Sequence, residues 1–316
     1  MVRKVAPNEI YIERVYDAPL RAVWEAWTDP KKVEKWWGPR GFTLTTHSKD
    51  LRPGGHWHYT MHGPDGKDWP NKTVYHEVEE CRKLVYDHGA NDEQPALFRV
   101  TALFSETRDG KTKLQMTMSL ATPESAKSIR QFIKQAGGNA TWDRLAEHLG
   151  ETGRGETSFV INRSFAAPID AIYKAWTTPA QLCHWLPPSG FTMECFQADI
   201  RTGGRCLSRM SNSEGVSFCV EFIYLECSPT RIVYTQRFCA ETGAPAKHPG
   251  LPEFPESLVN TVQFAQEEDG MTRVTLTTTT GGTPSTGEIK VFLEIRDGMT
   301  AGWSGSFDKL EEVVGV

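Results

Sequence analysis

The stretch RVYDAPLRAVWEAWTDPKKVEKWWGPRGFT, residues 14–43, decides the fold because it occurs twice. It returns as RSFAAPIDAIYKAWTTPAQLCHWLPPSGFT at residues 163–192, and the match runs on to DLRPGG (50–55) and DIRTGG (199–204). At this constant shift, about 17 of 42 positions are identical, which marks an internal repeat. Its period is the length of a whole domain. The sequence therefore predicts two copies of one fold, residues 1–150 and 157–316, with a linker over 151–156.

The composition is that of a soluble globular protein. Hydrophobic residues make up 39% and charged residues 24% of the chain, which is enough apolar material for two cores. The net charge of −5, without a dense Lys/Arg run, argues against a nucleic-acid partner. No segment approaches the roughly 20 apolar residues of a membrane span, and the N-terminus lacks the apolar core of a signal peptide. We therefore expect a cytoplasmic protein.

Periodicity predicts the elements of the first copy. Residues 9–17 alternate as a strand does. Two short helices with apolar stripes follow, one opening at Pro19 and one at Asp29-Pro30, where proline suits the first helical turn. Residues 42–120 then alternate with period two between turn signals, as antiparallel strands do. With the first strand this makes about seven, and a long helix is expected from Thr122 to Leu149.

The second copy repeats these elements but departs from the first in three ways. It carries an insertion over residues 239–256 with four prolines, which we expect to be irregular and exposed. Cys206 and Ser208 stand where the first copy has Trp57 and Tyr59, which predicts a roomier, less aromatic interior. Six of the seven cysteines lie in this copy, and such an odd, uneven set favours buried free thiols over a disulfide framework.

The order and spacing of these motifs carry a family resemblance. Each copy has an opening R-x-(F/Y)-x-AP, then AWT, a Trp-Pro-Gly-Phe segment, D-x-R-x-GG and a closing helix. Together they resemble the activator of heat-shock protein 90 ATPase homologue family, within the START-like (SRPBCC) superfamily. The resemblance implies an α+β fold of two tandem helix-grip domains. In each, a curved antiparallel sheet wraps around a long C-terminal helix, two short helices close one end, and an apolar cavity for lipids, sterols or polyketides lies between sheet and helix.

The residues expected to contact a ligand are mostly aromatic or apolar, because small-molecule pockets are lined mainly by such side chains. They lie on the short helices, the strand after the Gly-Gly turn and the closing helices. The candidates are Trp36, Trp37, Trp57, Tyr59, Met61, Phe132, Trp185, Cys206, Met210, Tyr234, Met299 and Trp303.

Candidate catalytic groups are sparse. His76, Tyr86 and His88 lie on the middle strands and, if they project inward, could serve as general acid or base. The three histidines His56, His58 and His62 alternate with the apolar set of their strand and are expected to face solvent, so we expect no metal site. We expect no cofactor.

We therefore expect a binding protein for a hydrophobic small molecule rather than an enzyme. Two alternatives remain open: a cyclase-, dehydratase- or hydrolase-type enzyme using the same cavity, and a co-chaperone that stimulates a heat-shock protein 90 ATPase through its surface. Contact between the two domains is also left open.

Overall fold

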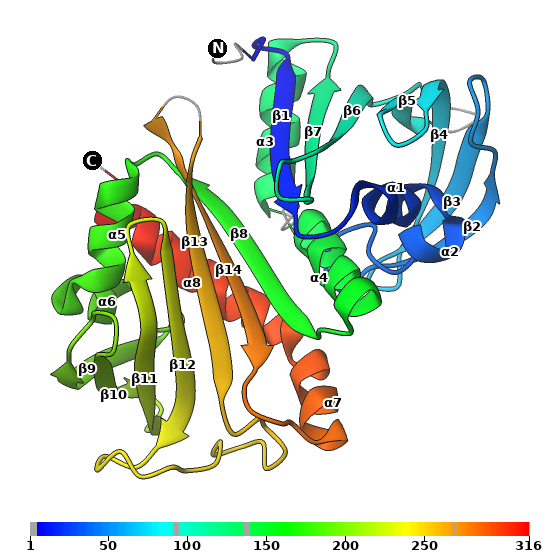
Figure 1. The fold of residues 1–316 in the computed structure, drawn as a ribbon. Helices are drawn as coiled ribbons and strands as arrows, with labels where there is room; N and C mark the ends of the chain where they lie inside the picture. The colour runs from blue at the N-terminus through cyan, green and yellow to red at the C-terminus, as the bar shows by residue number, and fades with distance from the viewer. Residues whose placement is uncertain (1–4, 91–94, 136–139, 268–269, 316) are drawn as a thin grey trace. The chain divides into compact units, whose positions relative to one another are not determined.

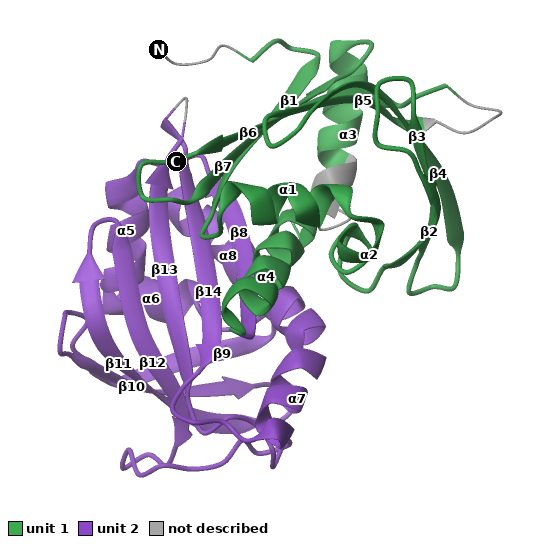
Figure 2. Cartoon of the chain, turned by 45° about the vertical axis from the view of Figure 1, so that its right-hand side comes forward, with its two compact units in different colours: residues 1–156 green, residues 157–316 purple. Residues whose placement is uncertain are grey.

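The computed structural model describes residues 5–90, 95–135, 140–267 and 270–315. Its chain divides into two compact units, residues 1–156 and 157–316, coloured separately in Figure 2. Each unit is a seven-stranded antiparallel sheet with helices against one face (Figure 1). This is the α+β arrangement that the repeated sequence predicts. The segment expected as a linker is mostly helical, because the last helix of the first unit continues to Arg154.

Unit 1 follows the predicted order of elements. Its sheet has the order β1-β7-β6-β5-β4-β3-β2, so the first and last strands in the chain pair with each other. The strands are β1 (Glu9–Tyr16), β2 (Thr43–Lys49), β3 (His56–His62), β4 (Asp68–Glu79), β5 (Lys83–Ala90), β6 (Phe98–Glu106) and β7 (Thr112–Ser119). The helices are α1 (Leu20–Thr28), α2 (Pro30–Val33), α3 (Pro123–Gln135) and α4 (Ala140–Arg154).

Unit 2 repeats this topology with the sheet order β8-β14-β13-β12-β11-β10-β9. Its strands are β8 (Ser158–Phe165), β9 (Phe191–Ala198), β10 (Arg205–Asn212), β11 (Ser217–Ser228), β12 (Arg231–Cys239), β13 (Leu258–Gln266) and β14 (Thr272–Thr280). Its helices are α5 (Ile169–Thr177), α6 (Pro179–Trp185), α7 (Thr286–Glu294) and α8 (Arg296–Val314).

The closing helix of each copy differs from the single long helix expected. In unit 2 it is interrupted at Ile295, whose φ of −86° and ψ of −3° lie in the bridge region and tighten the turn between α7 and α8. In unit 1 it is described as α3 and α4, and Gly137-Gly138 lies outside the described residues.

The repeated Gly-Gly turn has a steric cause. Gly54 and Gly203 adopt φ values of +78° and +79°, which side chains rarely tolerate. A Cβ on the following glycine, Gly55 or Gly204, would lie 2.2 or 2.1 Å from the carbonyl oxygen of the preceding aspartate. Only glycine fits at either position, so the D-x-R-x-GG motif fixes the hairpin that leads into β3 and β10.

Alternate residues of each sheet face the helices and form the core. The strands of unit 1 contribute buried residues such as Leu84, Phe104 and Leu114, and α1 and α4 contribute Val23 and Leu145. Unit 2 has a separate core of the same arrangement, with buried Phe165, Leu276 and Phe307. The inner face of each sheet is therefore where a ligand between sheet and helices would lie.

Candidate functional site

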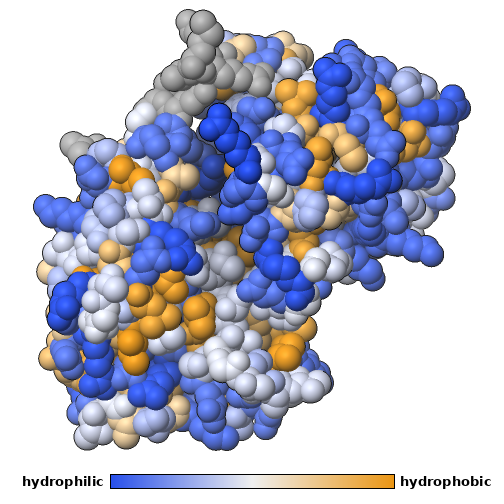
Figure 3. All heavy atoms as spheres, viewed as in Figure 1, coloured by the Kyte–Doolittle hydropathy of each residue, from blue (hydrophilic) through white to orange (hydrophobic). Residues whose placement is uncertain are grey.

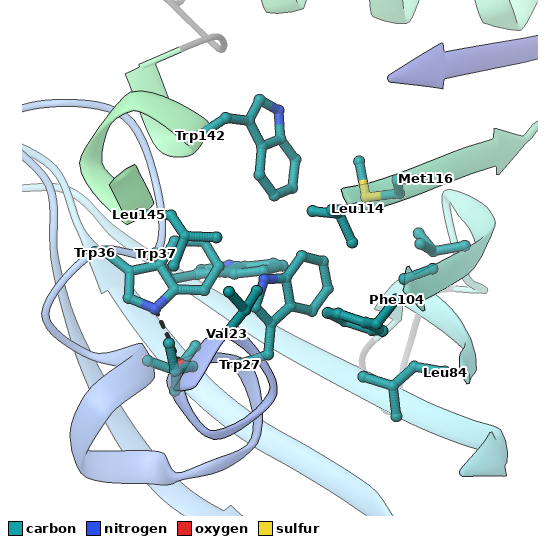
Figure 4. Close-up of a cluster of buried hydrophobic side chains, with 14 of the residues drawn as sticks. Val23, Trp27, Trp36, Trp37, Leu84, Phe104, Leu114, Met116, Trp142 and Leu145 are labelled. Atoms are coloured by element: carbon teal, nitrogen blue, oxygen red, sulfur yellow. Dashed lines mark hydrogen bonds between the residues drawn. The ribbon is translucent and has the colours of Figure 1, made fainter. Parts of the chain in front are cut away.

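Four tryptophans from α1, α4 and the segment after α2 form a cluster in the core of unit 1 (Figure 4). The rings of Trp27, Trp36, Trp37 and Trp142 lie with centroids 5.3–6.4 Å apart. Trp36 is fully buried, and its indole N–H donates to the carbonyl of Ala26 at 3.0 Å. Trp36 is therefore part of the core that fixes α1 to the segment after α2.

Trp37 extends from this cluster toward the sheet. Its ring centroid lies 5.5 Å from that of Trp57 on β3 and 6.2 Å from that of His88 on β5. Trp57 in turn stacks on Tyr59 at 4.0 Å, and the partly buried Met61 continues the same face of β3. The structure thus brings four of the expected ligand-contacting residues, Trp37, Trp57, Tyr59 and Met61, to one part of the interior.

Three buried polar atoms in this region make no well-formed hydrogen bond within the described residues. They are the hydroxyl of Tyr59, the hydroxyl of Thr73 on β4 and Nδ1 of His88 on β5. The three strands are neighbours in the sheet. Burial raises the pKa of Tyr59, while weak hydrogen-bonding interactions with the Trp37 and Thr73 side chains oppose that shift. The Tyr59 and Thr73 hydroxyls therefore lie close enough to interact, although neither makes a well-formed hydrogen bond. Buried polar groups are nearly always satisfied, so these poorly satisfied atoms are the candidate polar contacts of the site.

Tyr86 and His88 both face inward, as their candidate role requires. Burial raises the pKa of the Tyr86 hydroxyl far above its ordinary range, and the neighbouring Tyr75 and Tyr59 add to this shift. Burial lowers the pKa of His88 to about 4. At neutral pH the interior therefore presents a protonated phenol and an uncharged imidazole.

The low pKa of His88 predicts an acid sensitivity. Its folded pKa of about 4 lies below the ordinary 6.5, so the unfolded chain takes up this proton first as the pH falls. Stability is full above about pH 6.5 and falls toward pH 4, by about 3 kcal/mol for this one group. Unfolding free energies measured at both pH values should therefore differ less in His88→Gln, which introduces the residue found at the matching position of unit 2. An unchanged pH dependence in that variant would contradict the assignment.

His76 does not project inward. Its ring lies on the outer face, 2.8 Å from the Asp87 carboxylate, and Arg99 contacts the same carboxylate at 2.8 Å. A register shift between Tyr75 and Glu77 changes the alternation there, so that Tyr75 and Val78 pack on the core. The inward orientation considered for His76 is therefore wrong.

The amine of Lys49 was not anticipated from the sequence. It lies 4.1 Å from the centroid of the Trp57 ring and donates to the carbonyl of Trp27 at 2.9 Å. Burial lowers its pKa to about 7, against the opposing effect of the Asp29 and Glu34 carboxylates. The Lys49 amine is therefore partly uncharged at neutral pH, and it lies beside the ring of Trp57.

Unit 2 lines the matching region with smaller groups. Cys206 and Ser208 are fully buried where unit 1 has Trp57 and Tyr59, and Met210 follows them. Tyr234 is buried, and Met299 and Trp303 of α8 pack partly buried against the same core. Trp185 repeats the role of Trp36, because its indole donates to the carbonyl of Ala175 at 2.9 Å. Phe222 lies opposite Cys206 where unit 1 has Thr73 opposite Trp57, so both the less aromatic lining and the larger volume stay predictions.

A hydrogen-bonded polar chain crosses the inner face of unit 2. The Thr278 hydroxyl donates to Asn260 at 2.7 Å, and the Asn260 amide donates to Gln236 at 3.4 Å. The strand registers place Asn260 and Thr278 at the positions that Val100 and Met118 occupy in unit 1. Because apolar residues fill those positions in unit 1, the fold itself does not require the chain. Its polarity distinguishes the two interiors.

The insertion after β12 is irregular, as predicted, apart from one bridge between Cys239 and Pro245. Most of it is exposed. Its less exposed residues include His248 and Phe254, whose rings pack against Phe238 of β12 at 4.7 and 5.5 Å. The insertion therefore covers part of the inner face at this end of unit 2.

Among the remaining candidates, Phe132 lies in α3, but its side chain is outside the described residues. His56, His58 and His62 lie on the face of β3 opposite Trp57 and Tyr59, as predicted. His56 and His62 contact the Ser48 and Thr45 hydroxyls.

The surface shows fewer features that point to a function than the interior does. Hydrophilic side chains cover most of the face in Figure 3, with hydrophobic atoms in small groups between them. Within the described ranges, no helix is long and apolar enough to cross a membrane. The same residues contain no group of three or more His, Cys, Asp or Glu side chains placed to hold a metal ion.

Comparisons with known proteins agree with the repeat. The family model of the Activator of Hsp90 ATPase homolog 1-like protein matches twice, over residues 17–150 and 166–315. The chain belongs to this family. A search of functionally curated proteins finds no match.

Solved structures similar to this family member include single-copy and two-domain proteins. A protein of Nitrosomonas europaea is 24% identical, covering 48% of this chain and 99% of its own, with a TM-score of 0.43. One from Mycobacterium smegmatis is 25% identical over 46% and 93%, with a TM-score of 0.42. The di-domain ARO/CYC BexL of the BE-7585A biosynthetic pathway is 13% identical over 98% and 99%, with a TM-score of 0.37.

Reasoning from the sequence of this family member missed Thr73, Lys49 and Asn260. For Asn260 a signal existed, because it stands among Leu258, Val262 and Phe264 on the apolar positions of an alternating strand. Thr73 and Lys49 carry no such signal, because threonine and lysine are common on half-exposed strands.

Proposed function

We propose that the interior of unit 1 binds a largely apolar small molecule that carries one or two uncharged polar groups. One observation supports this most strongly: the hydroxyls of Tyr59 and Thr73 and Nδ1 of His88 are buried on adjacent strands without a well-formed hydrogen bond. Trp37 and Trp57 lie beside them.

The energetic argument rests on desolvation. A buried polar group left without a hydrogen bond costs about 1–3 kcal/mol. The Tyr59 and Thr73 hydroxyls satisfy each other only weakly, and Nδ1 of His88 has no hydrogen bond within the described residues. A ligand hydroxyl or carbonyl in their midst would remove that cost, while its apolar part would contact the indole rings. Both hydroxyls can donate or accept, and neutral His88 can do either at Nδ1 depending on its tautomer. Lipid-, sterol- and polyketide-like molecules with a hydroxyl or ketone group fit this description.

The first test asks what the protein holds. Native mass spectrometry of the full chain purified from its host should show a retained small molecule. An environment-sensitive dye then reports binding of two matched probes, a long-chain fatty alcohol and the alkane of the same length, by displacement.

The hydroxyls of Tyr59 and Thr73 should contribute to binding of the alcohol but not to binding of the alkane. Thr73→Val and Tyr59→Phe each remove one hydroxyl with little change of shape, so each should weaken alcohol binding by about 2- to 10-fold. Alkane binding should not change. Ser208→Ala, the counterpart of the Tyr59 change in unit 2, is the matched control and should leave alcohol binding to unit 1 intact. Equal weakening of both probes, or of neither, would contradict polar anchoring.

An enzyme of cyclase, dehydratase or hydrolase type in the same interior is the second candidate, and Lys49 is the observation that favours it. An amine with a pKa of about 7 can act as a general base at neutral pH, and Tyr86 or His88 could hold a second proton. Conversion of the retained molecule by the wild type, lost in Lys49→Met and kept in Lys72→Met, would support this candidate. A co-chaperone role would use the surface and would not respond to Thr73→Val.

A further inference from the structure

Three cysteine side chains meet at the edge of unit 2. Cys183 lies on α6, Cys195 on β9 and Cys206 on β10. The sulfur atoms of Cys195 and Cys206 are 3.8 Å apart, and the Cys183 thiol interacts with that of Cys195. All three are free thiols. Cys195 therefore contacts two other thiols, one from a helix and one from the neighbouring strand.

The residues at the same three positions in unit 1 form hydrogen bonds that connect neighbouring elements. At the shift of 149 residues they are Glu34, Thr46 and Trp57. The Thr46 backbone N–H donates to the Glu34 carboxylate at 2.8 Å, and the Trp57 indole N–H donates to the Thr46 hydroxyl at 3.2 Å. These hydrogen bonds join the segment after α2 to β2 and β3.

The three cysteines thus occupy the positions that in unit 1 connect the segment after α2 to the two edge strands, and we call this connection the joint. Unit 1 holds this joint with hydrogen bonds between strong donors and acceptors. Thiols form much weaker hydrogen bonds, so in unit 2 the reduced joint is held less firmly. Unlike the unit 1 joint, it can become covalent.

We propose that the cluster of Cys183, Cys195 and Cys206 is an oxidation site, at which a peroxide converts Cys195 and one neighbouring thiol into a disulfide that locks the joint. Cys183 and Cys195 are only partly buried, so a small peroxide can reach them. Cys206 is buried directly behind Cys195.

The chemistry balances in two steps. The Cys195 thiol first loses its proton, and the thiolate attacks one peroxide oxygen. The O–O bond breaks, sulfur is oxidised to a sulfenic acid, and the other oxygen leaves as hydroxide, which takes up the released proton to become water. The sulfur of Cys206 or Cys183 then attacks the sulfenic sulfur, the S–S bond forms, the S–O bond breaks, and the hydroxyl leaves with the thiol proton as a second water. Two thiols and one hydrogen peroxide give one disulfide and two waters. The sulfur atoms of Cys195 and Cys206 are 3.8 Å apart. A side-chain rotation must bring them to the disulfide bond length of about 2.05 Å.

The protonation of the cluster sets the conditions of the reaction. The Cys183 thiol lowers the pKa of Cys195, whereas the Cys206 thiol and burial raise it, to about 12 on balance. The thiolate, which is the reactive form, is therefore scarce at neutral pH. We expect the oxidation to speed up with rising pH.

The test exposes the full-length reduced protein to hydrogen peroxide and maps the products by mass spectrometry under non-reducing conditions. The expected product has lost two hydrogens and contains a peptide with Cys195 linked to one with Cys206 or Cys183. A thiol reductant should restore the starting mass. Recovery of Cys195 as a free thiol while Cys81 or Cys227 is oxidised would overturn the proposal. A disulfide formed only between Cys219 and Cys239, which face each other across β11 and β12, would overturn it as well.

Variants taken from unit 1 sharpen this test. Cys195→Thr introduces the residue that the same joint tolerates in unit 1, and it should abolish the cross-link. Cys183→Glu, also a unit 1 residue, should direct the entire cross-link to Cys206. Cys227→Ser is the matched control and should leave the yield unchanged. Circular dichroism verifies that each variant is folded, and a cross-link that persists in a folded Cys195→Thr protein would refute the site.

Discussion

Replacing Trp36 by alanine is expected to lower the free energy of unfolding of unit 1 by about 3–5 kcal/mol, the usual cost of removing a buried aromatic side chain. The indole is fully buried among Trp27, Trp37 and Trp142. Its loss leaves a cavity, and the carbonyl of Ala26 loses its donor. Because α1 and the segment after α2 meet at this ring, little relaxation can fill the space.

Urea unfolding followed by far-UV circular dichroism measures the effect. If the units unfold separately, only the transition of unit 1 should shift. Trp69→Ala is the matched control, because Trp69 is 51% exposed and its loss should cost less than about 0.5 kcal/mol. Equal effects of the two substitutions would show that Trp36 is not part of the core as described.

Replacing Arg40 by alanine should also destabilise unit 1 by about 3–5 kcal/mol, the typical cost of breaking a buried ion pair on one side. Arg40 binds Glu147 of α4 through two hydrogen bonds of 2.6 and 3.0 Å. Their side chains are only 10% and 4% exposed. The substitution leaves the Glu147 carboxylate buried without its guanidinium.

The double variant Arg40→Met with Glu147→Leu provides the check on this explanation. It removes both charges together, so it should recover most of the stability that Arg40→Ala loses. Arg21→Ala is the exposed control, because Arg21 and Glu80 are both 68% exposed, and it should have no measurable effect. Urea titrations of the four proteins decide the matter. A double variant as unstable as Arg40→Ala would mean that packing of the Arg40 stem, rather than charge, explains the loss.

The sequence could predict a large part of the fold because its signals are local and occur twice. Alternation over residues 42–120 marks the strands, and Pro19, Pro30, Pro168 and Pro179 mark the starts of the short helices. The repeat then supports each assignment independently. The closing helices were less well predicted, since the apolar spacing continues through Ile295 although α7 ends before this residue and α8 begins after it.

The candidate site depends more on contacts between distant residues. Alternation assigned Trp57 and Tyr59 to the inner face, where both are buried, whereas for Tyr86 and His88 it left the orientation open. It did not place His76, because the register shift in β4 arises from pairing with β5, and pairing irregularities of this kind leave no clear mark in one strand's own sequence.

What the sequence by itself determined is therefore the duplication, the order of elements and the face on which most strand residues lie, since each follows from spacing along the chain. Only the tertiary structure decided which buried polar groups lack a well-formed hydrogen bond. Tyr59, Thr73 and His88 come from three different strands, and whether each finds a partner depends on every side chain packed around it. The same holds for Cys183, Cys195 and Cys206, whose contact exists only because the sheet edge and α6 meet there. Satisfaction of a buried group is a property of its surroundings, and the surroundings are assembled by folding.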